Sequence, residues 1–163
     1  MGFSRLSIPS LLICLAVATI CPAAERWRFI VTCDSRGDVL HGVNEAILSE
    51  IASEIVRQDV DFLVYPGDLV YGGRIGPERF ERQLWTWVQA MRPVYDAGIP
   101  VYVCRGNHEV GDMWDAEPGQ LPDPNDNSSL RWLDVFGNPE HPNQILPDNG
   151  PANARYMSYS VRH

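Results

Sequence analysis

Three short apolar runs stand out along the chain, and each one leads into a cluster of polar residues. The runs span residues 29–33, 62–65 and 99–104. They lead into Asp34, into Asp68 and into Asn107-His108-Glu109. Continuous apolar runs rich in β-branched residues are typical of strands buried on both faces, as in a parallel sheet. The pattern therefore predicts three buried parallel strands.

Helical patterns separate the three runs. The first places apolar residues every four positions, with Leu48 and Ala52 beside them and Asn44 as a predicted N-cap: Val43, Ile47, Ile51 and Ile55. The second follows Pro77, which suits a first helical turn, with an apolar stripe at Phe80, Leu84, Trp87, Val88, Met91 and Val94. Strand, helix, strand, helix, strand predicts an α/β fold built from two right-handed βαβ crossovers.

The chain changes character after Glu109. Residues 118–151 hold seven of the 13 prolines, which predicts an irregular segment over 110–154. We expect one short helix within it, capped at Ser128 or Ser129 and carrying Leu130, Leu133 and Phe136. Residues 155–161 alternate weakly and resemble a further strand.

Residues 1–24 have the pattern of a secretory signal. Arg5 supplies a positive charge, residues 8–20 are mostly apolar, and small residues follow at 22–24. This apolar run is shorter than the roughly 20 residues that span a bilayer. The pattern predicts an exported protein, periplasmic or extracellular, whose mature domain covers 25–163 and has no stable membrane span. A retained anchor is the alternative.

Charge and cysteine content narrow the functional classes. A net charge of -8 argues against nucleic-acid binding, which needs a basic surface. All 13 cations are Arg, whose planar fork suits phosphate. Without the signal, Cys33 and Cys104 remain. Since both end apolar runs, we interpret them as buried thiols, with a disulfide between them as the alternative.

The residues that follow the predicted strands carry the candidate chemistry. Ligands bind outside the carboxyl ends of parallel strands, so Asp34, Asp68, Asn107 and His108 are expected at one sheet edge. Oxygen and imidazole donors suit divalent metals such as Mn, Fe or Zn. Two such ions roughly 3.5–4 Å apart would clamp the attacking and leaving oxygens of phosphoryl transfer. His41 and His141 are interpreted as surface or loop residues.

These motifs resemble those of a known family. Gly67-Asp68 and Gly106-Asn107-His108-Glu109 are similar to the second and third signature motifs of the calcineurin-like metallophosphoesterases. The first motif of that family is Asp-x-His, whereas this chain has Asp34-Ser35-Arg36. Purple acid phosphatases replace that His by a Tyr three residues after the second-motif Asp, and Tyr71 stands at that position. The chain therefore resembles the purple-acid-phosphatase-like branch of the family.

The resemblance implies a role for each matching residue. Asp34 and Tyr71 would bind the first metal, Asp68 would bridge the two metals, and Asn107 would bind the second. His108 would face the substrate as a proton donor, and Glu109 would orient it. Arg36 and Arg105, together with Arg74, are candidate phosphate contacts. The metals implied are two divalent or trivalent ions, Fe, Mn or Zn.

The resemblance covers residues 28–163 and implies an incomplete domain. The family fold is a two-sheet α/β sandwich, of which this chain would be the N-terminal βαβαβ half. The remaining His ligands, in Gly-His and Gly-His-x-His motifs, would lie in a missing C-terminal half or on a partner chain. The sequence thus predicts a two-metal phosphoesterase acting on a phosphate-ester small molecule or a phosphorylated substrate, with a truncated chain and an incomplete site. The alternatives are a non-catalytic remnant or interaction module, and an exported metal-free ligand-binding domain.

Overall fold

The computed structural model describes residues 26–72, 76–110 and 127–162. The predicted signal at residues 1–24 and Arg74 lie outside these ranges. So does the first part of the Pro-rich segment, residues 111–126. The fold below is that of the described ranges.

Three parallel strands form the sheet. They are β1 (Phe29–Val31), β2 (Phe62–Tyr65) and β3 (Val101–Val103), hydrogen-bonded in the order β1-β2-β3. Phe29 pairs with Phe62 in the first ladder, and Leu63 pairs with Val101 in the second. A helix or helix pair lies between consecutive strands along the chain. The predicted α/β class and parallel sheet are confirmed.

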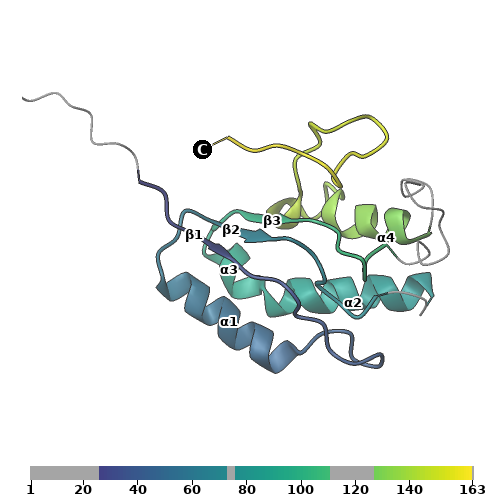
Figure 1. The fold of residues 1–163 in the computed structure, drawn as a ribbon, viewed down its shortest axis with the longest axis horizontal. Coiled ribbons are helices and arrows are strands. Elements are labelled where there is room, and N and C mark those ends of the chain that lie inside the picture. The colour runs from purple at the N-terminus through teal and green to yellow at the C-terminus, as the bar shows by residue number, and fades with distance from the viewer. Residues whose placement is uncertain (1–25, 73–75, 111–126, 163) are drawn as a thin grey trace, which may run out of the picture.

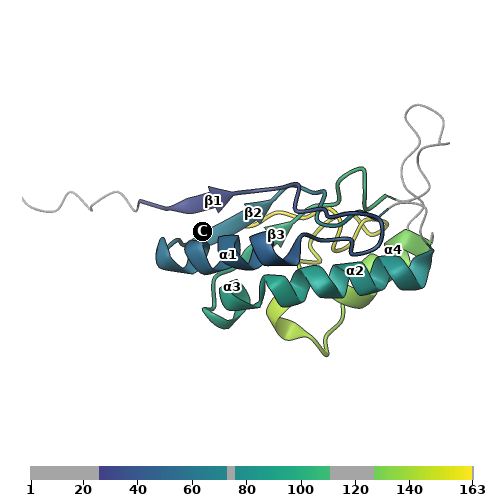
Figure 2. The same cartoon turned by 90° about the horizontal axis from the view of Figure 1, so that it is seen from below.

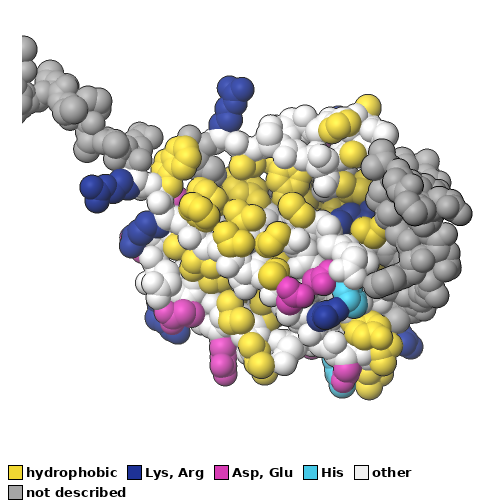
Figure 3. Space-filling view, viewed as in Figure 1, with side chains coloured by type: hydrophobic (Ala, Val, Ile, Leu, Met, Phe, Trp, Pro, Cys, Tyr) yellow, Lys and Arg dark blue, Asp and Glu magenta, His cyan; other side chains and the backbone are white. Residues whose placement is uncertain are grey.

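Among the described residues, helices cover one face of this sheet, as Figures 1 and 2 show for α1, α2 and α3. On the covered face Leu63, Tyr65 and Val103 are fully buried. On the other face Phe29 and Val31 remain 54% and 57% exposed. Figure 3 shows hydrophobic side chains gathered over the strands on that side. The prediction that all three strands are buried on both faces is therefore wrong.

Helix α1 (Glu45–Arg57) links β1 to β2 and begins after Asn44, whose side chain accepts the Ile47 N–H at 3.5 Å. Its buried stripe is Leu48, Ala52 and Ile55. The predicted line through Ile47 and Ile51 is wrong, since these residues are 54% and 37% exposed. Steps of four residues advance about 40° around a helix with 3.6 residues per turn. A line with that spacing turns away from the core.

The second helical pattern forms two helices rather than one. Helix α2 spans Pro77–Ala90, with Pro77 in the first turn as predicted, and α3 spans Arg92–Asp96. The break falls at Met91, two residues before Pro93. A proline has no N–H for an intrahelical bond and its ring clashes with the preceding turn. The helix therefore restarts with Pro93 in a new first turn.

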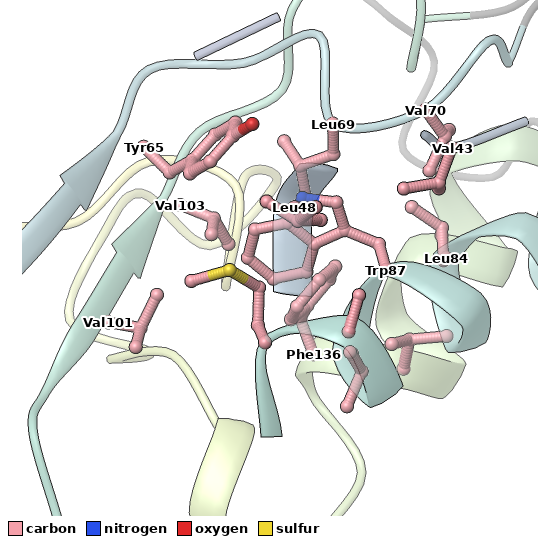
Figure 4. Close-up of a cluster of buried hydrophobic side chains, with 14 of the residues drawn as sticks. Val43, Leu48, Tyr65, Leu69, Val70, Leu84, Trp87, Val101, Val103 and Phe136 are labelled. Atoms are coloured by element: carbon pink, nitrogen blue, oxygen red, sulfur yellow. The ribbon is translucent and has the colours of Figure 1, made fainter. Parts of the chain in front are cut away.

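The core centres on Trp87 of α2 (Figure 4). Its ring meets Tyr65 of β2 edge-on at 5.1 Å between centroids, and Phe136 at 6.2 Å. Trp87, Leu69 and Leu84 are all fully buried. Burying a side chain of this size contributes about 1.5–3 kcal/mol relative to exposure. The loop after β2 is thereby tied to the same core as the helices.

Beyond β3 the chain forms α4 (Asn127–Phe136) and a 3-10 turn, η2 (Pro142–Gln144). The predicted short helix is confirmed, although it begins at Asn127. Residues 155–161 form turns and coil, so the predicted strand there is wrong. Tyr159 nevertheless donates its hydroxyl to the Val103 carbonyl at 2.6 Å and anchors this segment to β3.

All helices in the described ranges are short. The longest, α2, has 14 residues. Across residues 26–72, 76–110 and 127–162, no helix has the length and apolar character needed to cross a bilayer.

Candidate metal centre

The turns after β1 and β2 lie side by side at the carboxyl edge of the sheet. The ladder continues past the strands, with Thr32 N–H donating to Val64 O at 3.2 Å. Beyond it, Asp34 N–H approaches Gly67 O at 3.5 Å. Asp34 and Asp68 thus follow neighbouring parallel strands, which lie about 4.8 Å apart in any sheet. Figure 3 shows acidic, arginine and histidine side chains together at this part of the surface.

Asp34 and Asp68 share an uncommon backbone conformation. Their φ angles are 60° and 54°, in the left-handed region. For a residue with a Cβ this costs about 1–2 kcal/mol, although Asp tolerates it better than most. Such strain persists only where surrounding contacts hold it, and it gathers at functional sites. The turns after β1 and β2 therefore fix the backbone from which the two predicted carboxylates project.

Two glycines allow the turns after β2 and β3 to touch. A Cβ on Gly67 would lie 2.6 Å from Gly106 Cα, and a Cβ on Gly106 would lie 2.2 Å from Asp68 Oδ1. The Asp68 carboxylate rests on the Gly106 turn and accepts the His108 N–H at 3.3 Å. The glycines of the Gly-Asp and Gly-Asn-His-Glu motifs are therefore needed here for steric reasons, because a side chain on either one would collide with the neighbouring turn.

Glu109 does not reach the His108 ring, contrary to the orienting role inferred from the resemblance. Its side chain is fully buried and accepts three backbone N–H groups. Oε2 receives those of Asp68 at 2.9 Å and Gly106 at 2.8 Å, and Oε1 receives that of Val70 at 3.1 Å. Burial raises the pKa of this carboxyl, the three N–H donors counteract that rise, and the Asp68 charge adds to it.

His108 is held between two partners. Its Nδ1 lies 2.5 Å from the Tyr71 carbonyl, and its Nε2 contacts the Arg36 guanidinium. The Tyr71 ring meets the imidazole edge-on with centroids 6.0 Å apart. Tyr71 itself is fixed by its N–H, which donates to Gly42 O at 2.6 Å. The structure therefore brings His108, Tyr71 and Arg36 together, as the predicted site requires.

Asn107 and Arg105 flank this turn differently. Asn107 is exposed at its start. The Arg105 guanidinium turns toward α4, donating to the hydroxyls of Ser128 and Ser129, each at 2.7 Å, and to Glu109 O at 2.7 Å. A phosphate contact by Arg105 would compete with these bonds, and its substrate role stays a prediction.

The two cysteines are exposed and free, so their interpretation as buried thiols is wrong. They follow β1 and β3, which flank β2, and two strand spacings of about 4.8 Å exceed the Cα separation of a disulfide. Cys33 Sγ donates to Asp34 Oδ2 at 2.8 Å. This hydrogen bond, some desolvation and the charges of Asp34 and Asp68 raise the pKa of the Cys33 thiol.

His41 and His141 lie away from this site. His41 is exposed and pairs with Asp38 at 2.9 Å. His141 is exposed and meets the Trp85 ring with centroids 4.7 Å apart. Both are surface residues, as predicted.

The sequence prediction missed two residues, Ser35 and Gln83, that support the loops of the site. Ser35 donates to Leu69 O at 2.8 Å and accepts the Trp87 Nε1–H at 3.0 Å. Gln83 of α2 is buried and accepts the Gly72 N–H at 3.0 Å. Gln83 could have been noticed as a polar residue beside the apolar stripe of its helix. Ser35 carries no comparable signal.

The donor set fits a hard cation. Asp34 and Asp68 supply carboxylate oxygens, and neither forms an ion pair with a cation among the described residues. Those ranges also contain no group of three or more His, Cys, Asp and Glu side chains placed to hold a metal. The Tyr71 phenol and the Asn107 amide are the other hard oxygen donors predicted for this edge.

The chain is an α/β protein with a parallel sheet and two carboxylates at the carboxyl edge, where such sheets bind their ligands. A family model for the calcineurin-like phosphoesterases matches residues 37–159. The chain belongs to the calcineurin-like phosphoesterase family, and hydrolase activity follows at that level. Comparisons with curated proteins and with solved structures each returned no match. The family match begins after Asp34 and Arg36, whose assignment depends on the geometry above.

Proposed function

We propose that this chain hydrolyses phosphate esters at a site that binds two divalent or trivalent metal ions, Fe, Mn or Zn. Its metal ligands would be Asp34, Asp68, Tyr71 and Asn107. The observation that carries the proposal is the pair Asp34 and Asp68. Both are held at positive φ on neighbouring turns and lack a cationic partner among the described residues. Bound ions would polarise the phosphoryl group and neutralise the charge that develops on it.

The chain's own residues would bind the ester and move the proton. His108 presents Nε2 beside the Arg36 guanidinium. Because Nδ1 faces a carbonyl that only accepts, Nδ1 carries a proton, and Nε2 accepts from the Arg36 guanidinium. Nε2 would donate to a phosphate oxygen or to the leaving group only when the ring holds a second proton and Arg36 has turned to the phosphate. The Arg36 fork, exposed and beside His108, would orient the phosphate through charge-assisted hydrogen bonds.

Two observations support the purple-acid-phosphatase-like branch within the family. Arg36 occupies the third position of the first motif, where an imidazole ligand would otherwise stand. Tyr71 lies beside His108 and is held there by the Gly42 carbonyl. A phenolate at this place would replace the lost ligand.

The rest of the proposal concerns the substrate class, a partner chain and export. A small phosphate ester or a phosphorylated substrate fits an acidic chain better than a nucleic acid does, because the net charge is -8. A partner chain could supply further imidazole ligands to the second ion. Export under the direction of residues 1–24 also remains a prediction, since those residues lie outside the described ranges.

Metal binding and hydrolysis by the full chain test this function together. Equilibrium dialysis against Mn²⁺ and turnover of p-nitrophenyl phosphate should both be detectable in the wild type. Asp68→Asn should lose both. Asp59→Asn is the matched control, because Asp59 also has a positive φ, of 50°, but precedes β2 at the opposite end of the sheet.

The alternatives give different results. One equivalent of Mn²⁺ or less without turnover would support a non-catalytic module. Absence of metal binding would support a metal-free ligand-binding domain. Equal effects of Asp68→Asn and Asp59→Asn would overturn the assignment of Asp68.

A further inference from the structure

We propose that Glu109 is a positioning residue that holds the backbone of both candidate metal-binding turns, after β2 and after β3, in one geometry. This inference rests on the proposed function, because it concerns ligands of the same site. It replaces the orienting contact with the His108 ring, which the structure does not contain.

The contacts of Glu109 coincide with the candidate ligands. Oε2 alone joins the two turns, since it accepts N–H groups from Asp68 and from Gly106. The Gly106 amide precedes Asn107. Oε1 accepts the N–H of Val70, which precedes Tyr71. Each candidate ligand on these turns therefore lies at, or one residue after, an amide fixed by this carboxylate.

A buried carboxylate suits this position for a chemical reason. An ionised carboxylate only accepts hydrogen bonds, and the three backbone groups that contact it here are all donors. Glutamine would direct N–H groups at one or more backbone N–H groups and leave them unsatisfied in a buried site. The like charge of Asp68 nearby makes burial of Glu109 costly, so the three donors are needed to offset it.

Helix α4 is connected to Glu109 through Arg105. Arg105 donates to Glu109 O and to the hydroxyls of Ser128 and Ser129 on α4. The Glu109 N–H in turn donates to Gly106 O at 3.2 Å. Glu109 is thus held at its backbone by the helix layer and holds the site turns with its side chain.

The test compares Glu109→Gln with Gln144→Ala in the full chain. Gln144 is also buried and donates to a backbone carbonyl, that of Val135, but it lies on η2 away from the site. Loss of a residue that orients metal ligands typically weakens metal affinity by about 10–100-fold. Glu109→Gln should weaken Mn²⁺ binding by about that factor and speed amide hydrogen exchange at Asp68, Val70 and Gly106. Gln144→Ala should lower thermal stability and leave Mn²⁺ affinity unchanged.

Each outcome separates this inference from the proposed function. Wild-type Mn²⁺ affinity in Glu109→Gln, or unchanged exchange at the three amides, would overturn the positioning role alone. Absence of Mn²⁺ binding by the wild type would overturn the proposed function and this inference with it. Should Glu109→Gln fail to fold, Glu109→Asp replaces it. The shorter carboxylate keeps its acceptors but loses reach, so intermediate affinity is expected and wild-type affinity would overturn the role.

Discussion

The imidazole Nδ1 of His108 lies 2.5 Å from the backbone carbonyl of Tyr71. A carbonyl only accepts, so Nδ1 carries a proton in this contact and Nε2 faces Arg36. The ring is therefore fixed in one orientation before any substrate arrives. A group that must exchange a proton with a phosphate ester gains from such preorganisation, because little rearrangement is left for the reaction itself.

His108→Gln should lower phosphate-ester turnover by about 100-fold or more, since glutamine can donate a hydrogen bond but cannot act as a general acid. Mn²⁺ affinity should change little, because His108 is not among the proposed metal ligands. Steady-state kinetics with p-nitrophenyl phosphate and equilibrium dialysis measure the two effects. His41→Gln, at an exposed residue paired with Asp38, is the control. Retained turnover in His108→Gln would exclude His108 as the proton donor.

Gly106→Ala should disturb the metal site, because the new Cβ would lie 2.2 Å from Asp68 Oδ1 and 2.5 Å from Asp68 N. Overpacking of this kind typically costs about 1–3 kcal/mol. The comparison is Gly98→Ala, which strains a φ of 72° but meets no atom within 4 Å. Thermal unfolding should show destabilisation in both variants, whereas Mn²⁺ dialysis should show weaker binding only in Gly106→Ala. Equal Mn²⁺ affinities would mean that the two turns can separate without cost to the site.

The three parallel strands and the site edge could be predicted because they depend on local patterns. The apolar runs ending at Asp34, Asp68 and Asn107 gave the strands and their carboxyl edge. Parallel pairing then placed residues distant in sequence together. The Asn44 cap and Pro77 first turn likewise follow from properties of single residues.

Contacts that depend on tertiary geometry could not be predicted in this way. The interpretation of Glu109 as a partner of His108 assumed that neighbours in sequence interact, whereas its carboxylate points back to three backbone amides. The turn of Arg105 toward α4 depends on where Ser128 and Ser129 lie in space. The exposed outer face of β1 was also missed, since an apolar run does not reveal whether a second layer covers it.

Tyr71→Phe tests the proposed phenolate ligand by its colour. Ferric phenolate complexes absorb visible light, so the wild-type chain loaded with Fe³⁺ should show a visible band that Tyr71→Phe lacks. Tyr156→Phe should keep the band, because Tyr156 lies in the segment after α4. Absorption spectra at matched iron content decide the result. A band that survives Tyr71→Phe would assign the phenolate elsewhere and remove the main support for the purple-acid-phosphatase-like branch.

Tyr159→Phe should change how stability depends on pH. Its hydroxyl donates to the Val103 carbonyl at the end of β3, a contact that contributes about 1 kcal/mol at neutral pH. Burial, with smaller effects from Cys104 and Tyr102, raises the pKa of Tyr159 above its ordinary value near 10. Between those two pKa values the unfolded chain releases this proton and the folded chain keeps it. The free energy of unfolding therefore falls as pH rises past about 10.

The variant lacks this titration, so its deficit relative to the wild type should be largest below pH 10 and should shrink above it. Urea unfolding at pH 7 and at pH 10.5 measures both differences. Tyr156→Phe removes a hydroxyl from the same segment, but that hydroxyl holds no strand carbonyl among the described residues, so its difference should stay small at both pH values. A deficit of Tyr159→Phe that grows between pH 7 and pH 10.5 would contradict the expected direction of the change. It would mean that the folded state stabilises the ionised rather than the neutral phenol, and that Tyr159 does not anchor its segment as a hydrogen-bond donor.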